Sequence, residues 1–183
     1  MRNLNPKLKE WLDARVEAVA EPRLLFRRAM RAFVGVREEG GNNKGPIVEL
    51  IQDTVGHAEG EPWCMSLVQS ALAYVESVLG VKSPIAAGEH CMTVWRDTPH
   101  AQRVRFEPLP GAIIIWKHGD SFAGHTGIFE DSRGGKMLTI EGNTESGLSE
   151  LGSLVREGGG VYECVRDRHA NGSMRVVGFL KPF

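Results

Sequence analysis

Cys64, His125 and Glu141 are residue types that cooperate in nucleophilic catalysis, and they occur in that order along the chain. Cys64 follows a turn-forming stretch at residues 60–62 and begins a predicted helix. Unpaired backbone N–H groups and the helix dipole favour a thiolate there, and the same groups can stabilise the oxyanion formed when a thiolate attacks an amide. The dipole contributes only about 0.3–1 kcal/mol, so a strong nucleophile also needs a neighbouring base.

His125 is the candidate base. It opens a predicted strand between Gly124 and Gly127, where the missing side chains let a backbone or a substrate approach closely. An imidazole titrates near pH 7, so it can take the thiol proton and return it to a leaving amine. Glu141 and Asn143 end the next predicted strand, and residues two apart in a strand point to the same face. Both side chains are therefore candidates to orient one imidazole nitrogen.

The elements that must position these residues follow from the spacing of apolar side chains. Helical periodicity is present at residues 8–19, 25–33 and 64–79. The second half contains five short segments rich in β-branched and aromatic residues, at residues 112–116, 125–129, 137–140, 160–165 and 174–180. Helices followed by strands, without a βαβ rhythm, predict an α+β fold with N-terminal helices packed on an antiparallel sheet of five or six strands.

The composition argues against several other classes of function. Lys and Arg number 22 against 23 Asp and Glu, and aromatic residues are only 7%, so we expect no nucleic-acid binding. The three cysteines at 64, 91 and 164 are widely spaced with no CxxC pair, which predicts free thiols and argues against both a disulfide framework and a thiolate zinc site. We also expect no cofactor. No apolar run approaches the roughly 20 residues of a membrane span, so we expect no membrane insertion.

Residues 1–183 show no internal repeat and no linker, so we expect a single catalytic domain and a monomer. Residues 1–31 form a helical extension of this domain. The polar N-terminus lacks the apolar core of a secretory signal, which predicts synthesis in the cytoplasm without a signal peptide.

Three segments in order resemble the CHAP family, the cysteine, histidine-dependent amidohydrolases and peptidases of the papain-like, NlpC-type superfamily. They are GEPWCMSLV at residues 60–68, GHTGI at 124–128 and IEGNT at 140–144. PGAIIIW at residues 110–116 resembles the strand that those proteins place ahead of the histidine, and the likeness covers roughly residues 32–180. A cysteine at a helix start, a histidine at a strand start and a polar residue on the neighbouring strand form a papain-like arrangement.

The resemblance implies a role for each matching residue. Cys64 would be the nucleophile, His125 the general base and acid, Glu141 the group that orients the imidazole, and Asn143 its support. Replacing Glu141 with Gln is then expected to lower turnover with little change in thermal stability.

The resemblance also bears on the surroundings of the nucleophile. Trp63 and Gly124 are expected to border the substrate, although Trp63 fits the core equally well. Some relatives bind calcium through acidic residues in the loop before the nucleophile. Here that loop contains Asn42, Asn43 and Lys44 with no Asp, so we expect no metal.

The activity implied is hydrolysis of an amide or peptide bond of bacterial peptidoglycan through a cysteine thioester, by an endopeptidase or an N-acetylmuramoyl-L-alanine amidase. The implied setting is a phage endolysin delivered through holin pores or a virion, or a bacteriolytic effector secreted into a rival's periplasm. Two other classes stay open: a cysteine amidase that acts on a small amide, and a non-catalytic wall-binding module. Clearing of purified walls distinguishes the first alternative, and alkylation of Cys64 well below the ordinary thiol pKa of about 8.5 distinguishes the second.

Overall fold

The first two helices begin where the sequence provides a capping residue followed by a proline. In this computed structural model, which describes residues 2–145 and 159–183, α1 (Pro6–Asp13) and α2 (Pro22–Ala32) each start with proline. Asn5 and Glu21, just before them, accept hydrogen bonds from backbone N–H groups of the first turn. The remaining helices are α3 (Pro46–Asp53), α4 (Cys64–Leu79) and α5 (Cys91–Asp97). Segments 46–53 and 91–97 are too short for their periodicity to have revealed a helix.

The strands form one antiparallel sheet. They are β1 (Arg103–Val104), β2 (Ile113–His118), β3 (Gly124–Arg133), β4 (Lys136–Thr144), β5 (Gly160–Arg166), β6 (Ala170–Asn171) and β7 (Met174–Leu180). Their order is β1-β7-β2-β3-β4-β5, and β6 pairs with β7. The five expected strands correspond to β2, β3, β4, β5 and β7, while β1 and β6 contain only two residues each. The predicted α+β class, with helices first and a six-stranded antiparallel order, is confirmed.

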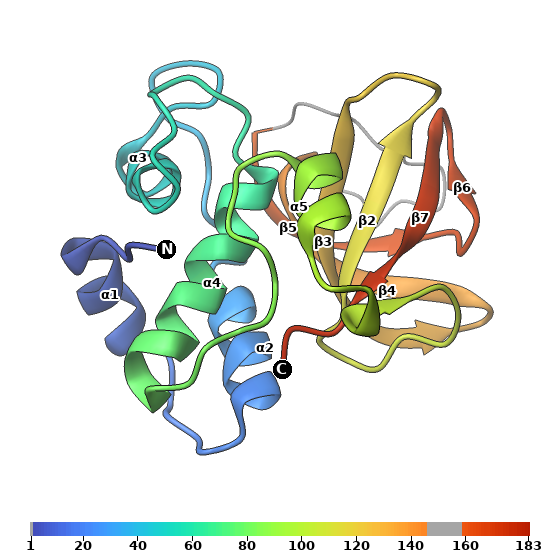
Figure 1. Cartoon of the computed structure of the whole chain (residues 1–183). Coiled ribbons are helices and arrows are strands. Elements are labelled where there is room, and N and C mark those ends of the chain that lie inside the picture. The colour runs from blue at the N-terminus through green and yellow to red at the C-terminus, as the bar shows by residue number, and fades with distance from the viewer. Residues whose placement is uncertain (1, 146–158) are drawn as a thin grey trace.

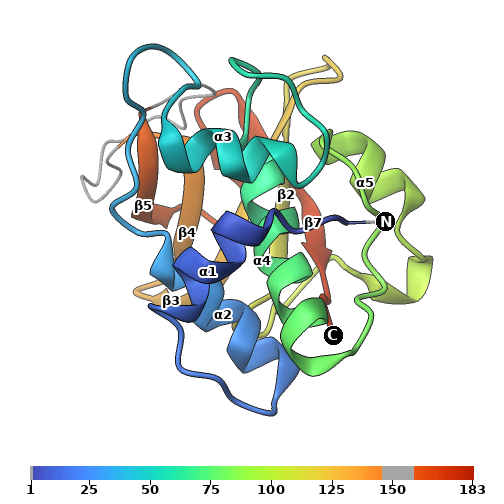
Figure 2. The ribbon, with the colours of Figure 1, turned by 90° about the vertical axis from the view of Figure 1, so that its left-hand side faces the viewer.

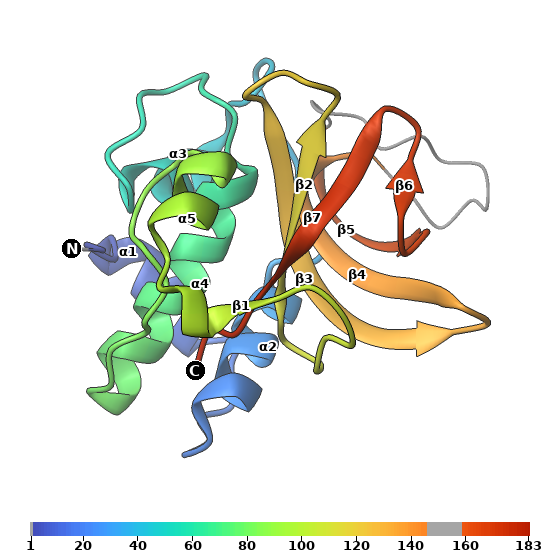
Figure 3. The same cartoon turned by 45° about the vertical axis from the view of Figure 1, so that its right-hand side comes forward.

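The helices lie on one side of the sheet, as Figures 1 and 3 show. The long helix α4 contacts β3 and β4, and its residues from Cys64 to Val75 are all buried. Apolar side chains of α4 meet the isoleucines Ile113, Ile115, Ile128 and Ile140 of the sheet in one core. Figure 1 also shows α5 beside the strands, where it contacts β2 and β3. The start of α4 and the start of β3 are therefore both held close to α5.

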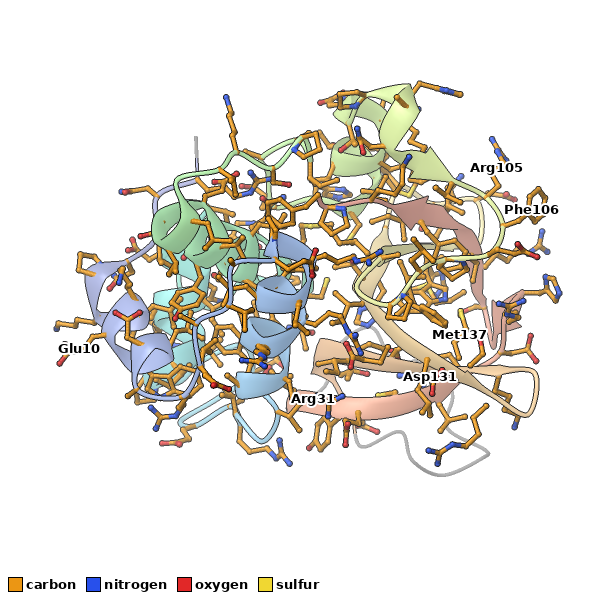
Figure 4. All side chains as sticks on the ribbon, turned by 90° about the horizontal axis from the view of Figure 1, so that it is seen from below. Glu10, Arg31, Arg105, Phe106, Asp131 and Met137 are labelled. Atoms are coloured by element: carbon orange, nitrogen blue, oxygen red, sulfur yellow. The ribbon has the colours of Figure 1, made fainter. Side chains whose placement is uncertain are left out.

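The N-terminal helices share this core. Leu8 and Leu12 of α1 and Phe26 of α2 are fully buried in it, and Figure 2 shows α1 and α2 next to α4. Arginine side chains add polar links on the underside of the molecule, where Figure 4 labels Arg31 of α2. Its guanidinium pairs with Glu130 of β3 at 2.7 Å. Helices α1 and α2 thus share a core with the helix and the sheet that carry the candidate catalytic residues.

Within the described part of the chain, no helix has the length and apolar character needed to span a membrane.

Candidate active site

Cys64 opens α4 and faces a hollow of about 300 Å³. Its side chain is mostly buried, with 7% of the residue exposed. Trp63, the residue before the helix, forms no side-chain cap on the first-turn N–H groups. The hollow is lined by His57, Glu61, Pro62, Cys64, Glu89, His90, Cys91, Ala123 and Gly124. Larger hollows lie on other parts of the surface, but this one contains the sulfur, and we call it the cleft.

His125 lies at the start of β3 and is fully buried. Its Nε2 is 3.1 Å from Oε2 of Glu141. Its Nδ1 is buried and has no hydrogen-bond partner among the described residues, so Nδ1 is the nitrogen left for the Cys64 thiol. The Trp116 ring lies against the imidazole with 5.6 Å between the centroids. The imidazole is thus held on one side by a carboxylate and covered on another by an indole.

The pKa values of Cys64 and His125 move in the directions that favour an ion pair. A hydrogen bond with Cys91 and the nearby imidazole of His125 hold the pKa of Cys64 well below its ordinary value, although burial opposes them. Burial alone would lower the pKa of His125, but its contacts with Cys64 and Glu141 outweigh burial and raise that pKa to about 9. A thiolate and an imidazolium therefore coexist near neutral pH, which is the activated form of a cysteine nucleophile.

Glu141 is fully buried and is held from three sides. Besides His125, it accepts hydrogen bonds from Nε and Nη2 of Arg166, at 2.9 and 2.8 Å, and from the Thr139 hydroxyl. Burial would raise the pKa of Glu141, but His125 and Arg166 lower it to about 2. Glu141 is therefore ionised at any pH where the histidine works. Its position fits the role expected for it, that of orienting the imidazole.

Arg166 is a member of this site that the sequence reasoning did not identify. It is 1% exposed and lies at the end of β5, where it pairs in register with Met137 of β4. No local motif marks it. An arginine just after an apolar strand segment was the available signal, and such residues are usually solvated.

Glu141 is hydrogen-bonded to His125, whereas Asn143 is hydrogen-bonded to Asn43. A register shift between Glu141 and Thr144 interrupts the strand, and Asn143 adopts a positive φ of 54°. Its amide donates a hydrogen bond to Oδ1 of Asn43, whose own amide donates to the Gly60 carbonyl at 3.1 Å. We expected Glu141 and Asn143 to point to the same face because they are two apart in a strand. The register shift breaks this alternation between them. Asn143 links the loop around Asn43 to the segment that leads into the nucleophile.

The two residues expected at the substrate occupy different environments. Trp63 is fully buried, and its Nε1 donates to Glu38 at 2.9 Å, so it lies in the core behind the cleft. Gly124 does line the cleft. A Cβ at Gly124 would lie 2.7 Å from the Trp116 carbonyl oxygen and 3.0 Å from Cβ of Cys91. The glycine is therefore required for β3 and α5 to approach each other at the catalytic end of the sheet.

Gly127 gives a test of how closely Glu141 is positioned. A Cβ at Gly127 would lie 2.6 Å from Cγ of Glu141, so Gly127→Ala must displace the carboxylate from His125. We expect activity to fall by at least about tenfold, because misplacement of a catalytic group by about 1 Å can cost 10²-fold. Gly159→Ala is the matched control, since nothing lies within 4 Å of its Cβ position. Equal turnover of the two variants on purified walls would contradict this positioning.

The loop that binds calcium in some relatives does not fit that ion here. Lys44 places its ammonium group 2.7 Å from Glu59, and the buried Asn43 is engaged with Gly60 and Asn143. Among residues 2–145 and 159–183, no three His, Cys, Asp or Glu side chains are grouped as metal ligands.

An α+β fold in which a cysteine at a helix start faces a histidine on an antiparallel sheet defines the papain-like class of cysteine hydrolases. Residues 56–143 match the family model of the CHAP domain, and this segment contains Cys64, His125, Glu141 and Asn143. Residues 56–143 therefore form a CHAP domain, the domain of cysteine- and histidine-dependent amidohydrolases and peptidases that the sequence motifs indicated. No curated protein and no solved structure matched the chain.

Proposed function

We propose that this protein hydrolyses an amide or peptide bond of bacterial peptidoglycan through a thioester on Cys64. The observation that carries the proposal is the Cys64, His125 and Glu141 constellation at the cleft, within a segment that matches the CHAP domain. CHAP domains typically act on peptidoglycan.

The geometry supports a mechanism in which a named group carries out each chemical step. The Cys64 thiolate attacks the carbonyl carbon, and the first-turn N–H groups of α4 stabilise the oxyanion. The His125 imidazolium protonates the departing amine through Nδ1, which leaves an acyl thioester and a neutral imidazole. That imidazole then takes a proton from water, the hydroxide attacks the thioester, and Cys64 leaves as a thiolate. Glu141 holds Nε2 of the imidazole throughout.

Digestion of purified walls tests the proposal most directly. The protein should clear a wall suspension, and mass spectrometry of the released fragments identifies the bond as an N-acetylmuramoyl-L-alanine amide, a stem-peptide link or a cross-bridge. A small-amide amidase would leave the walls turbid while hydrolysing a small amide such as a glutathione conjugate. A wall-binding module would sediment with the walls and release no fragments.

The substrate also suggests a biological setting. Peptidoglycan lies outside the cytoplasmic membrane, so the proposed activity requires delivery of the protein to the wall. A phage lysin released through holin pores or carried in a virion fits this requirement, as does an effector passed into a rival's periplasm. The protein can be expressed inside a bacterium with and without a holin. Cells should lyse only when the holin is present, because only then does the protein reach the wall.

The ion pair of Cys64 and His125 predicts how alkylation of Cys64 and hydrolysis of walls depend on pH. Because the pKa of Cys64 is lowered, alkylation of Cys64 by iodoacetamide should persist at pH 6–7, well below the pKa of about 8.5 of a free thiol. Wall hydrolysis also needs the imidazolium as an acid, so it should decline as the pH rises through about 9, the pKa of His125. Alkylation should continue above pH 9, because it needs only the thiolate. Alkylation that begins only above pH 8 would contradict the ion pair.

A further inference from the structure

A second thiol lies beside the candidate nucleophile. Cys91 begins α5 and is 4% exposed, and its sulfur lies 3.9 Å from the sulfur of Cys64. Both cysteines line the cleft. They are 27 positions apart in the chain, and they meet because α5 packs against β2 and β3 beside the start of α4. Gly124 permits this packing, since a Cβ there would lie 3.0 Å from Cβ of Cys91.

We propose that Cys91 belongs to the catalytic centre, where its thiol donates a hydrogen bond to the Cys64 sulfur and stabilises that sulfur as a thiolate. The inference rests on the proposed function in one respect, which is that Cys64 is the nucleophile. It adds a third group to the environment of the sulfur, after His125 and the N–H groups at the start of α4.

The direction of the hydrogen bond follows from the charges. Two thiolates 3.9 Å apart in a buried site would repel strongly, so one of the two sulfurs keeps its proton. Cys64 has the imidazolium of His125 beside it, whereas the contact with Cys64, and then burial, raise the pKa of Cys91 well above its ordinary value. Cys91 therefore remains the S–H donor over the working pH range. Because a thiol is neutral, it stabilises the thiolate without competing with His125 for the negative charge.

Other titratable groups near the sulfur do not take this position. His57 and Glu61 precede α4, Glu89 and His90 precede α5, and all four line the cleft. Nδ1 of His57 lies 3.1 Å from the Ser66 hydroxyl, and its Nε2 lies 3.6 Å from Glu89. Among the described hydrogen bonds, the Cys64 sulfur is paired with the sulfur of Cys91 and with none of these four side chains.

The test is the pH dependence of Cys64 alkylation by iodoacetamide, followed by mass spectrometry of the Cys64 peptide. In Cys91→Ala the midpoint should move upward by about one pH unit, because the thiolate loses a hydrogen-bond donor that stabilises its charge. Cys91→Ser keeps a donor and should return the midpoint toward the wild-type value. Cys164→Ala is the matched control, since Cys164 is a buried cysteine on β5 outside the cleft, and the midpoint of Cys64 alkylation in this variant should equal that of the wild type.

An unchanged midpoint in Cys91→Ala would overturn the inference. An equal shift in the alanine and serine variants would also overturn it, because loss of packing rather than of a donor would then explain the effect. Alkylation needs no wall substrate. The inference can therefore fail in a protein that digests walls, and it can hold in one that does not.

A second measurement on the wild-type chain does not depend on variants that fold. One equivalent of hydrogen peroxide should oxidise the two thiols to a disulfide and yield two molecules of water, with loss of two hydrogens from the protein mass. The sulfurs would need to close from 3.9 Å to about 2.0 Å. A peptide that joins Cys64 to Cys91, cleaved by dithiothreitol, supports the contact. Persistence of Cys64 as a sulfenic acid, trapped with dimedone, while Cys91 stays a thiol contradicts it.

Discussion

Replacement of Cys64 with alanine should abolish the release of fragments from purified walls, with turnover at least about 10³-fold below wild type. Loss of a catalytic nucleophile in a hydrolase costs up to about 10⁶-fold in kcat, and no other residue in the cleft can form the thioester in its place. Cys91 has a raised pKa and remains protonated, and its sulfur has no histidine partner among the described contacts. Cys64→Ser should be similarly inactive, because a hydroxyl ionises far less readily than a thiol.

The fold should survive the Cys64→Ala substitution. Alanine keeps the helix start, and the removed sulfur borders the cleft, so the melting temperature should change by only a few degrees. Cys164→Ala removes another buried sulfur outside the cleft and should retain wild-type turnover. Full activity in Cys64→Ala, or equal loss in Cys164→Ala, would reject Cys64 as the nucleophile. Fragment release followed by mass spectrometry, with calorimetry on the same samples, measures both quantities.

The sequence predicted the candidate catalytic residues that lie at the start of a recognisable helix or strand. Cys64 could be assigned to a helix start because apolar residues recur behind it at helical spacing, and the strand that begins with His125 could be recognised by its β-branched residues. The order of these elements also predicted the α+β class, since helices precede strands without alternation. The assignments of Cys64 and His125 to their elements each use residues within 16 positions of one another.

The parts of the site that were not predicted depend on contacts between distant segments. The hydrogen bond from Asn143 to Asn43 joins residues 100 positions apart, and Asn143 leaves the expected strand face because its φ is positive. No periodicity carries such information. The same holds for Arg166, whose partner Glu141 lies 25 positions away on the neighbouring strand. Arg166 also changes one expectation. Glu141→Gln should cost stability as well as turnover, because it leaves a buried guanidinium without its carboxylate.

The buried pair of Arg166 and Glu141 predicts a large loss of stability when one partner is removed. In Arg166→Met the carboxylate of Glu141 keeps only His125 as a charged partner, and we expect the free energy of unfolding at pH 7 to fall by about 3–5 kcal/mol. Turnover should fall as well, because the carboxylate that holds the imidazole loses its anchor. Arg31→Met is the matched control. Its side chain is 53% exposed while it pairs with Glu130 and Glu163, so its loss should cost about 1 kcal/mol or less.

The loss of unfolding free energy in Arg166→Met should depend on pH if Arg166 stabilises the protein through its ion pair with Glu141. It should not depend on pH if Arg166 acts through packing alone. The pKa of Glu141 is about 2 in the folded protein and about 4.5 in the unfolded chain, so its contribution is complete above pH 4.5 and is lost as the pH falls toward 2. The difference in unfolding free energy between wild type and Arg166→Met should therefore be largest above pH 4.5 and shrink below it. Urea denaturation at pH 7, 4.5 and 3 measures this difference, and a difference that stays constant with pH would show that Arg166 acts through packing alone. In the double variant Glu141→Gln/Arg166→Met, the cost should be less than the sum of the single variants, because each single change leaves one buried partner uncompensated.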